Sequence, residues 1–132
     1  MAGILKVDDL RGNTSAGDIT ITDGSATSSL QSGLVKAWGN FTSEGTFTTN
    51  DSFNTSSITD TGTGSAQPNW SNNFSSANYA ATMSCEDSSA YHGMMQQISN
   101  PTTALTNILS ASATNTARDV EYGYYMTSGD LA

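Results

Sequence analysis

Charged side chains are scarce in this sequence of 132 residues. Only 12% of the residues are Asp, Glu, Lys or Arg, against roughly 25% in an ordinary soluble domain. Polarity comes instead from the hydroxyl and amide groups of many Ser, Thr and Asn residues. Long solvated helices need Glu, Lys, Gln and Ala, whereas Thr favours strands and Asn and Ser favour turns. The composition therefore disfavours a helical protein and favours one rich in strands and turns.

Basic residues are especially few. Lys6, Arg11, Lys36 and Arg118 face 12 acidic residues, which gives a net charge of −8. Binding to phosphates or to an anionic membrane needs clustered Lys and Arg, and these four are scattered. No apolar run approaches the roughly 20 residues of a membrane-spanning helix. We expect no nucleic-acid partner and no membrane insertion.

Cysteine and histidine each occur once, as Cys85 and His92. A disulfide within the chain is therefore impossible, and a zinc site lacks ligands. A Ser–His–Asp site would depend on His92 with a nearby serine and Asp87, but no nucleophile-elbow pattern surrounds Ser84 or Ser88. We expect a structural or surface histidine, no metal and no cofactor.

Carboxylates in pairs are the remaining catalytic possibility. Glycoside cleavage needs two carboxyl groups roughly 5 to 10 Å apart across a sugar-binding cleft. Glu86 with Asp87, and Asp119 with Glu121, qualify by residue type alone. We therefore expect that the protein is not an enzyme.

Eleven aromatic residues, grouped in clusters, argue against disorder. From Leu34 onward, short segments of β-branched and aromatic residues alternate with Gly and Asn turns. Strands spaced by about 8 to 12 residues are typical of an antiparallel β-sandwich or a jelly-roll-like fold, which we predict for residues 35–132. Pro68 favours an edge position for its strand, and residues 103–112 fit a strand or a short helix. The predicted strands cover residues 34–41, 45–49, 52–53, 57–60, 66–70, 79–85, 92–98 and 120–127.

Residues 1–34 differ from the remainder because they contain no aromatic residue. Ile4, Leu5, Val7 and Leu10 form an apolar cluster ahead of a polar segment. Residues 18–24 alternate like a short strand that ends in an Asp-Gly turn, and residues 25–33 have the small side chains of a linker. We interpret this segment as a short extended anchor that docks on another protein; a frayed terminus is the alternative.

A series of short motifs carries a family resemblance. The series resembles a module near the C-termini of tail-fibre and other surface proteins of tailed bacteriophages, especially phages of marine bacteria and cyanobacteria. The ending at residues 129–131 and the leader at residues 5–10 are also similar to those proteins. The motifs, in order, are Lys36-Ala37-Trp38, Asn40-Phe41, Gly45-Thr46, Asp51–Asn54, Ser56–Gly64, Asn69-Trp70 and Asn78-Tyr79.

The resemblance implies a non-enzymatic protein on the virion surface that forms a homotrimer. Residues 1–34 would attach it to another virion protein of the tail, baseplate or capsid, and the sandwich would contact a glycan or protein of the host surface. A tail-fibre-type appendage ranks first, because the resemblance is strongest to fibre tips. A capsid decoration or head-fibre protein is the alternative, and a free carbohydrate-binding or depolymerising protein ranks third.

Alternation along the last strand predicts which tyrosines share a face. Tyr122 and Tyr124 share one face, which we expect in the core or in a subunit seam, and we expect Tyr125 on the exposed face. Gly62 and Gly64 are expected to form a turn with positive φ. The expected site residues form three groups. The attachment group contains Ile4, Leu5, Val7 and Leu10, and the receptor-contact group contains Tyr91 and Tyr125. The group expected in the core or in a trimer seam contains Trp38, Phe41, Phe53, Ile58, Trp70, Phe74 and Tyr79.

Overall fold

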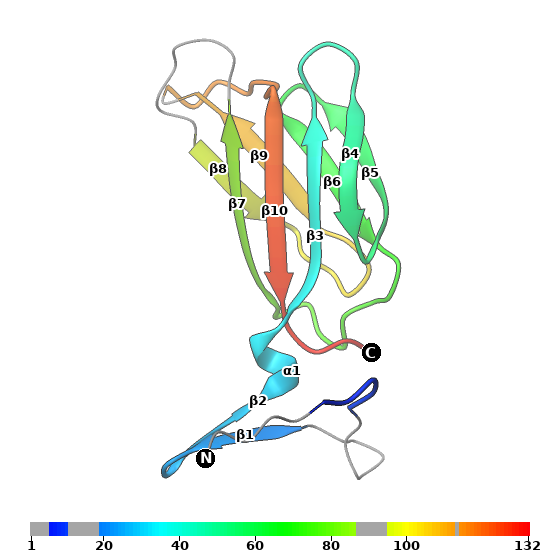
Figure 1. Ribbon diagram of the computed structural model, residues 1–132. Coiled ribbons are helices and arrows are strands. Elements are labelled where there is room, and N and C mark those ends of the chain that lie inside the picture. Colours follow the sequence, from blue (N-terminus) through cyan, green and yellow to red (C-terminus); the bar gives the residue numbers. More distant parts are fainter. Residues whose placement is uncertain (1–5, 11–18, 87–94, 113) are drawn as a thin grey trace. The chain divides into compact units, whose positions relative to one another are not determined.

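The computed structural model describes residues 6–10, 19–86, 95–112 and 114–132 (Figure 1). The chain divides into two compact units, Met1–Gly33 and Leu34–Ala132. Each unit has its own sheet structure, so each is described separately.

The first unit contains a β-hairpin followed by one helical turn. Strands β1 (Thr20–Asp23) and β2 (Ala26–Ser29) pair antiparallel, and α1 (Leu30–Gly33) follows directly. Gly24 takes a φ of 62°, as an Asp-Gly turn requires. The linker expected over residues 25–33 was therefore wrong, because the turn folds Ala26–Ser29 back onto the preceding strand.

The second unit is an antiparallel β-sandwich, which confirms the fold class expected from the sequence. Its two four-stranded sheets have the strand orders β4-β3-β10-β7 and β5-β6-β9-β8. Residues 107–111, within the ambiguous 103–112 segment, form a strand. The strands are β3 (Val35–Thr42), β4 (Thr48–Phe53), β5 (Thr55–Gly62), β6 (Ser65–Trp70), β7 (Ala80–Glu86), β8 (Met95–Ser99), β9 (Asn107–Ala111) and β10 (Tyr122–Ser128).

Pro68 does not lie on an edge strand, as the sequence had suggested. Its strand, β6, lies between β5 and β9. The ladder between β6 and β9 includes only Ser65 and Ala66, so it has ended before the proline. Beyond it, Pro68 uses only its carbonyl, which accepts a hydrogen bond from the amide of Thr106 (3.2 Å). The missing N–H of proline is tolerated here because the loop before β9 replaces regular pairing.

A single asparagine carries the chain from one sheet to the other. Asn54 lies between β4 and β5 with a φ of 51°, a left-handed conformation that asparagine tolerates. Its Oδ1 accepts hydrogen bonds from the backbone amide (2.8 Å) and side-chain amide (2.9 Å) of Asn72. Its Nδ2 donates to the Asn72 carbonyl (3.2 Å). These bonds join the connection between β4 and β5, where the chain passes from one sheet to the other, to the loop that follows β6.

The core between the sheets is built around the ring of Trp70. The rings of Phe74 and Tyr79 meet it edge-on, with centroids 5.6 and 6.0 Å away, and the ring of Tyr125 lies 6.0 Å away. Edge-to-face contacts of this kind add to the gain from burying the rings. The buried hydrophobic residues are Ala37, Phe41, Ile58, Ala66, Trp70, Phe74, Ile108, Val120 and Tyr125.

Two glycines on the central strands give room to two core rings. Gly39 on β3 pairs with Tyr125 on β10, and Gly123 on β10 pairs with Phe41 on β3. A Cβ atom at Gly39 would lie 2.5–2.7 Å from atoms of the Tyr125 side chain, and one at Gly123 would clash with the Phe41 ring. Each ring therefore covers the glycine opposite it. We call these two contacts the glycine–ring pairs.

The glycine–ring pairs predict a strong effect of one added methyl group. Gly39→Ala and Gly123→Ala should each lower the free energy of unfolding by about 1–3 kcal/mol, the usual cost of overpacking a core. The midpoint of urea unfolding measures the change. Gly33→Ala is the matched control, since nothing lies within 4 Å of a Cβ there. Equal midpoints for all three variants would contradict the role given to the pairs.

Candidate interaction site on an outer sheet face

The outer face of the β4-β3-β10-β7 sheet carries a row of exposed apolar side chains. Trp38 on β3 pairs with Phe53 on β4 and with Met126 on β10. Their side chains are 38%, 53% and 50% exposed. A soluble monomer rarely leaves large neighbouring apolar side chains together in water without a function for them. We call Trp38, Phe53 and Met126 the apolar row.

A shallow pocket of about 200 Å³ lies at one end of the apolar row. Met126 contributes to its wall, and Val35, the first residue of β3, is itself 44% exposed. The pocket extends the apolar surface toward the end of the sheet at which β3 begins. It is lined by Val35, Ala80, Ala81, Thr82, Met126, Thr127 and Ser128.

Two tyrosines lie on the same face, nearer the other end of the sheet. Tyr122 and Tyr124 are 37% and 38% exposed, and their rings stack with centroids 6.4 Å apart and an interplanar angle of 23°. Tyr124 pairs with Asn40 on β3 and with Ser84 on β7. We call Tyr122 and Tyr124 the tyrosine pair; polar side chains flank it on both neighbouring strands.

The polar groups beside the tyrosine pair are held in place. Asn50 donates from Nδ2 to Oδ1 of Asn40 (3.0 Å) and to the hydroxyl of Thr42 (3.2 Å). Asp51, opposite Asn40, accepts the backbone amide of Ser52 (2.8 Å). These contacts fix the Asn40 amide and the Asp51 carboxylate at the side of the tyrosine pair.

The opposite sheet has a different outer face. Gln67 donates from Nε2 to Oδ1 of Asn107 (2.8 Å), and Asn69 donates from Nδ2 to the hydroxyl of Ser57 (3.1 Å). Because these hydroxyl and amide groups bond one another, fewer of them are available for a partner. We call this face the amide network.

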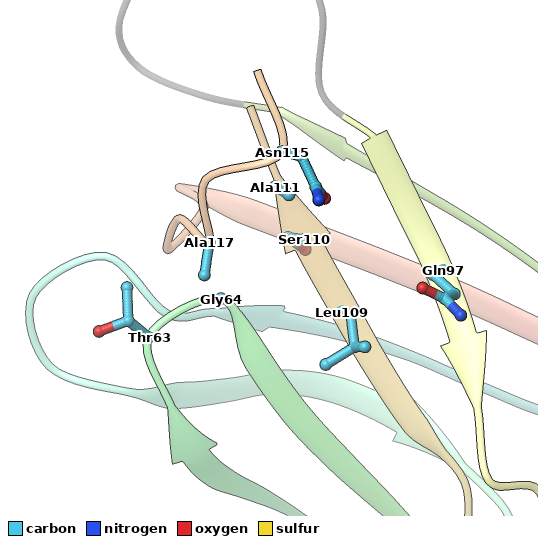
Figure 2. A pocket seen from close by; sticks show the side chains of 8 residues that line it. All are labelled: Thr63, Gly64, Gln97, Leu109, Ser110, Ala111, Asn115 and Ala117. Carbon is cyan, nitrogen blue, oxygen red and sulfur yellow. The ribbon is translucent and has the colours of Figure 1, made fainter. Parts of the chain in front are cut away.

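A second hollow of about 200 Å³ lies beside strands β8 and β9 (Figure 2). The side chains of Gln97, Leu109, Asn115 and Thr63 surround it, and none of its described lining residues ionises. Asp119, the closest candidate for acid–base chemistry in the sequence analysis, instead accepts the amide of Gly64 (2.7 Å). The lining offers hydrogen-bonding groups but no group for proton transfer.

Gly64 also explains why the sequence needs a glycine beside this hollow. Its φ is 68°, and a Cβ atom there would lie 2.7 Å from the backbone nitrogen of Arg118. Gly62 has a φ of 130°. The positive φ values predicted for this turn are confirmed.

The residues expected in the core or seam separate into two sets. Phe41, Ile58, Trp70 and Phe74 are buried, and Tyr79 packs against them. Trp38 and Phe53 lie instead on the outer face, so they are not core residues. A role for these two in a subunit seam stays a prediction.

Tyr125 was wrongly expected on the exposed face. It is 4% exposed, and its hydroxyl lies 2.7 Å from that of Thr55 on the opposite sheet. The Thr55 hydroxyl also lies 3.2 Å from the carbonyl of Phe53, and either hydroxyl can donate in the contact with Tyr125. The alternation along β10 was correct, but its two faces were exchanged. The missed signal was Gly39, which makes room for a ring on the inner side of β3.

Several expected residues cannot be placed. Tyr91, His92, Ile4 and Leu5 lie outside the described residues. Val7 and Leu10, the described members of the attachment group, are 53% and 52% exposed. Among the described residues, no group of three or more His, Cys, Asp or Glu is placed to hold a metal ion. Within that same described part of the chain, no helix is long and apolar enough to cross a membrane.

No protein-family model, curated protein or solved structure matches this chain.

The buried hydroxyl of Tyr125 predicts a loss of stability at high pH. Burial raises the pKa of Tyr125 to about 12, and the hydrogen bond with Thr55 partly opposes the increase. Because this pKa lies above the unfolded value of about 10, the contribution to stability is complete below pH 10 and is lost as the pH rises through 12. The free energy of unfolding should fall by about 1–3 kcal/mol over that range.

Tyr125→Phe isolates this contribution. The variant should lose about 1 kcal/mol at pH 7, because Thr55 loses its partner, and its stability should fall less steeply between pH 10 and 12. Urea unfolding at several pH values measures both effects. Tyr122→Phe, which changes an exposed ring, is the control. Parallel pH profiles for wild type and Tyr125→Phe would contradict the assignment.

Proposed function

We propose that this chain is a non-enzymatic structural protein on the surface of a tailed-bacteriophage virion, of the tail-fibre type. The observation that carries the proposal is the ordered series of motifs between Lys36 and Tyr79. In the fold these motifs contribute to β3, β4, β5 and β6. They supply framework features such as the Trp70 core and the Asn54 crossing, so the resemblance concerns residues that determine the sandwich.

The small first unit supports attachment through the N-terminal segment. Val7 and Leu10 are more than half exposed, although apolar side chains gain free energy when they leave water. Docking on another virion protein of the tail, baseplate or capsid would bury them. This role assigns residues 1–34 to attachment and the sandwich to display on the virion surface.

The apolar row supports self-association, which we propose to give a homotrimer. Tryptophan, phenylalanine and methionine are enriched in protein interfaces, and the row carries all three side by side. Its only charged neighbour at an outward position of β3 is Lys36. Burying the row between copies would remove apolar surface from water, and the one neighbouring carboxylate on β4, that of Asp51, would lie at the edge of the contact.

A capsid decoration or head-fibre protein is the second candidate. The division into one small unit and one sandwich favours it, since a decoration protein needs only a contact with the shell and a displayed domain. The tail-fibre-type protein and the capsid decoration protein would use the same attachment segment and the same displayed sandwich. They differ only in where on the virion the protein is attached.

A double variant tests the subunit seam. Trp38→Ser with Phe53→Ser should convert a trimer into monomers, so that the mass measured by sedimentation falls about threefold. Leu109→Ser is the control, because Leu109 is a similarly exposed apolar residue on the other sheet. A monomeric wild type, or a double variant that stays trimeric, would exclude this seam.

A second double variant tests the attachment. Val7→Ser with Leu10→Ser should lower the number of copies per purified virion by about tenfold, since each change removes apolar contact area. Quantitative mass spectrometry of the particles provides the count. Ile21→Ser, which is 49% exposed in the same unit, is the control.

The same count locates the protein. A few trimers per particle indicate a tail position, and dozens or hundreds of copies indicate the capsid. Absence of the wild-type chain from virions would refute the proposed function.

A further inference from the structure

The tyrosine pair offers two neighbouring aromatic rings on one outer sheet face, and we call this surface the platform. The two rings are nearly parallel, with an interplanar angle of 23°, and both are more than one-third exposed on one side of a sheet. Each ring presents an apolar face beside a polar hydroxyl, a combination suited to ligands that are partly apolar and partly wet. A sugar ring has the same mixed character, with C–H groups on its faces and hydroxyl groups around its edge.

The neighbouring strands add hydrogen-bonding groups beside the rings. Asn40 and Ser84 lie opposite Tyr124 on either side, and Glu86 lies opposite Tyr122. The contact with Asn50 fixes the Asn40 amide. Carboxylate, amide and hydroxyl groups next to apolar ring faces form the usual arrangement of a site that orients a small polar ligand. Sugar hydroxyls can donate to Glu86 and exchange hydrogen bonds with Asn40 and Ser84.

Charge determines which class of ligand suits the platform. Among the described residues, the charged side chains at outward positions beside it, Asp51 and Glu86, are both acidic, and the chain carries a net charge of −8. Anionic ligands would be repelled. A second copy docked at this end would bring its own carboxylates against these. The apolar row meets less of this repulsion, because it is bordered by Lys36 as well as by Asp51.

We propose that the tyrosine pair, with Asn40, Ser84 and Glu86, binds a neutral glycan. Successive sugar units rest on the rings of Tyr122 and Tyr124, and their hydroxyl groups bond the side chains on β3 and β7. Tyr124 and Met126 are two residues apart on β10, so the glycan site adjoins the apolar row at one side. From there the site extends to Tyr122, six residues along β10 from Ser128 and about 20 Å from the end of the sheet at which β3 begins. The inference deepens the proposed function, on which it rests for its biological setting.

The test uses the full chain and neutral hexasaccharides of glucose, mannose, galactose and N-acetylglucosamine. Isothermal titration calorimetry should detect binding of at least one of them, and a uronic-acid hexasaccharide should bind more weakly. Tyr122→Ala and Tyr124→Ala should each weaken binding by about tenfold, because each removes one stacking face. Tyr124→Phe keeps the ring and should change the affinity less than threefold, roughly, since it loses a single neutral hydrogen-bonding group.

Two controls separate glycan binding from folding and from self-association. Urea unfolding establishes that each alanine variant is folded. Phe53→Ala, on the same sheet face but in the apolar row, should leave glycan affinity unchanged and weaken self-association. Failure of all four hexasaccharides to bind, or equal binding by wild type and both alanine variants, would overturn the inference. Dissociation of an oligomer by Tyr122→Ala would also overturn it, because the pair would then belong to a subunit contact.

The outcome is independent of the virion experiments. Glycan binding by a protein that is absent from virions would refute the proposed function and leave the platform established. Incorporation into virions without glycan binding would support the proposed function and refute glycan binding by the platform.

Discussion

The fit of two rings against two glycines determines which way the central strands face. Tyr125 covers Gly39, and Phe41 covers Gly123, so both rings must lie between the sheets. Because successive strand residues point to opposite sides, the neighbours of these residues are then forced outward. Moving the register by one residue would exchange the two faces and force the rings against side chains. The exposed positions of Trp38, Tyr124 and Met126 therefore follow from packing in the interior.

The two outer faces of the sandwich differ in how far their groups are already bonded. On one sheet, side-chain amides and hydroxyls such as those of Gln67 and Asn107 satisfy one another. On the other, aromatic rings and a methionine remain in contact with water. A hydrogen-bonded surface gains little from a partner, whereas exposed apolar surface gains from being covered. This difference supports the proposals that place partners on the β4-β3-β10-β7 sheet, a second copy on the apolar row and a glycan on the tyrosine pair.

Much of the fold could be predicted because local patterns and tertiary packing agree. Alternation located most of the strands, and Gly62 and Gly64 were recognised as a turn that needs positive φ. Tyr125 was misplaced because alternation tells which residues share a face, but not which face is buried. That choice depends on Gly39, a contact across two strands. Pro68 was misplaced for a similar reason, since the bond from Thr106 comes from a loop distant in sequence.

The candidate site was harder to predict than the fold. Its residues come from β3, β4, β7 and β10, and only the strand order makes them neighbours. Trp38 and Phe53 were expected in the core or in a trimer seam because large apolar residues usually are buried. The sequence contains no indication that their strands would place them together on an outer face.

The amide network has a consequence for the conditions in which the protein can work. Dissolved salt screens interactions between charges, and it does so more strongly as ionic strength rises. Hydrogen bonds between neutral groups, such as those joining Asn69 to Ser57 and Gln67 to Asn107, carry no net charge to screen. Charge screening by dissolved salt therefore leaves these contacts of the amide network in place.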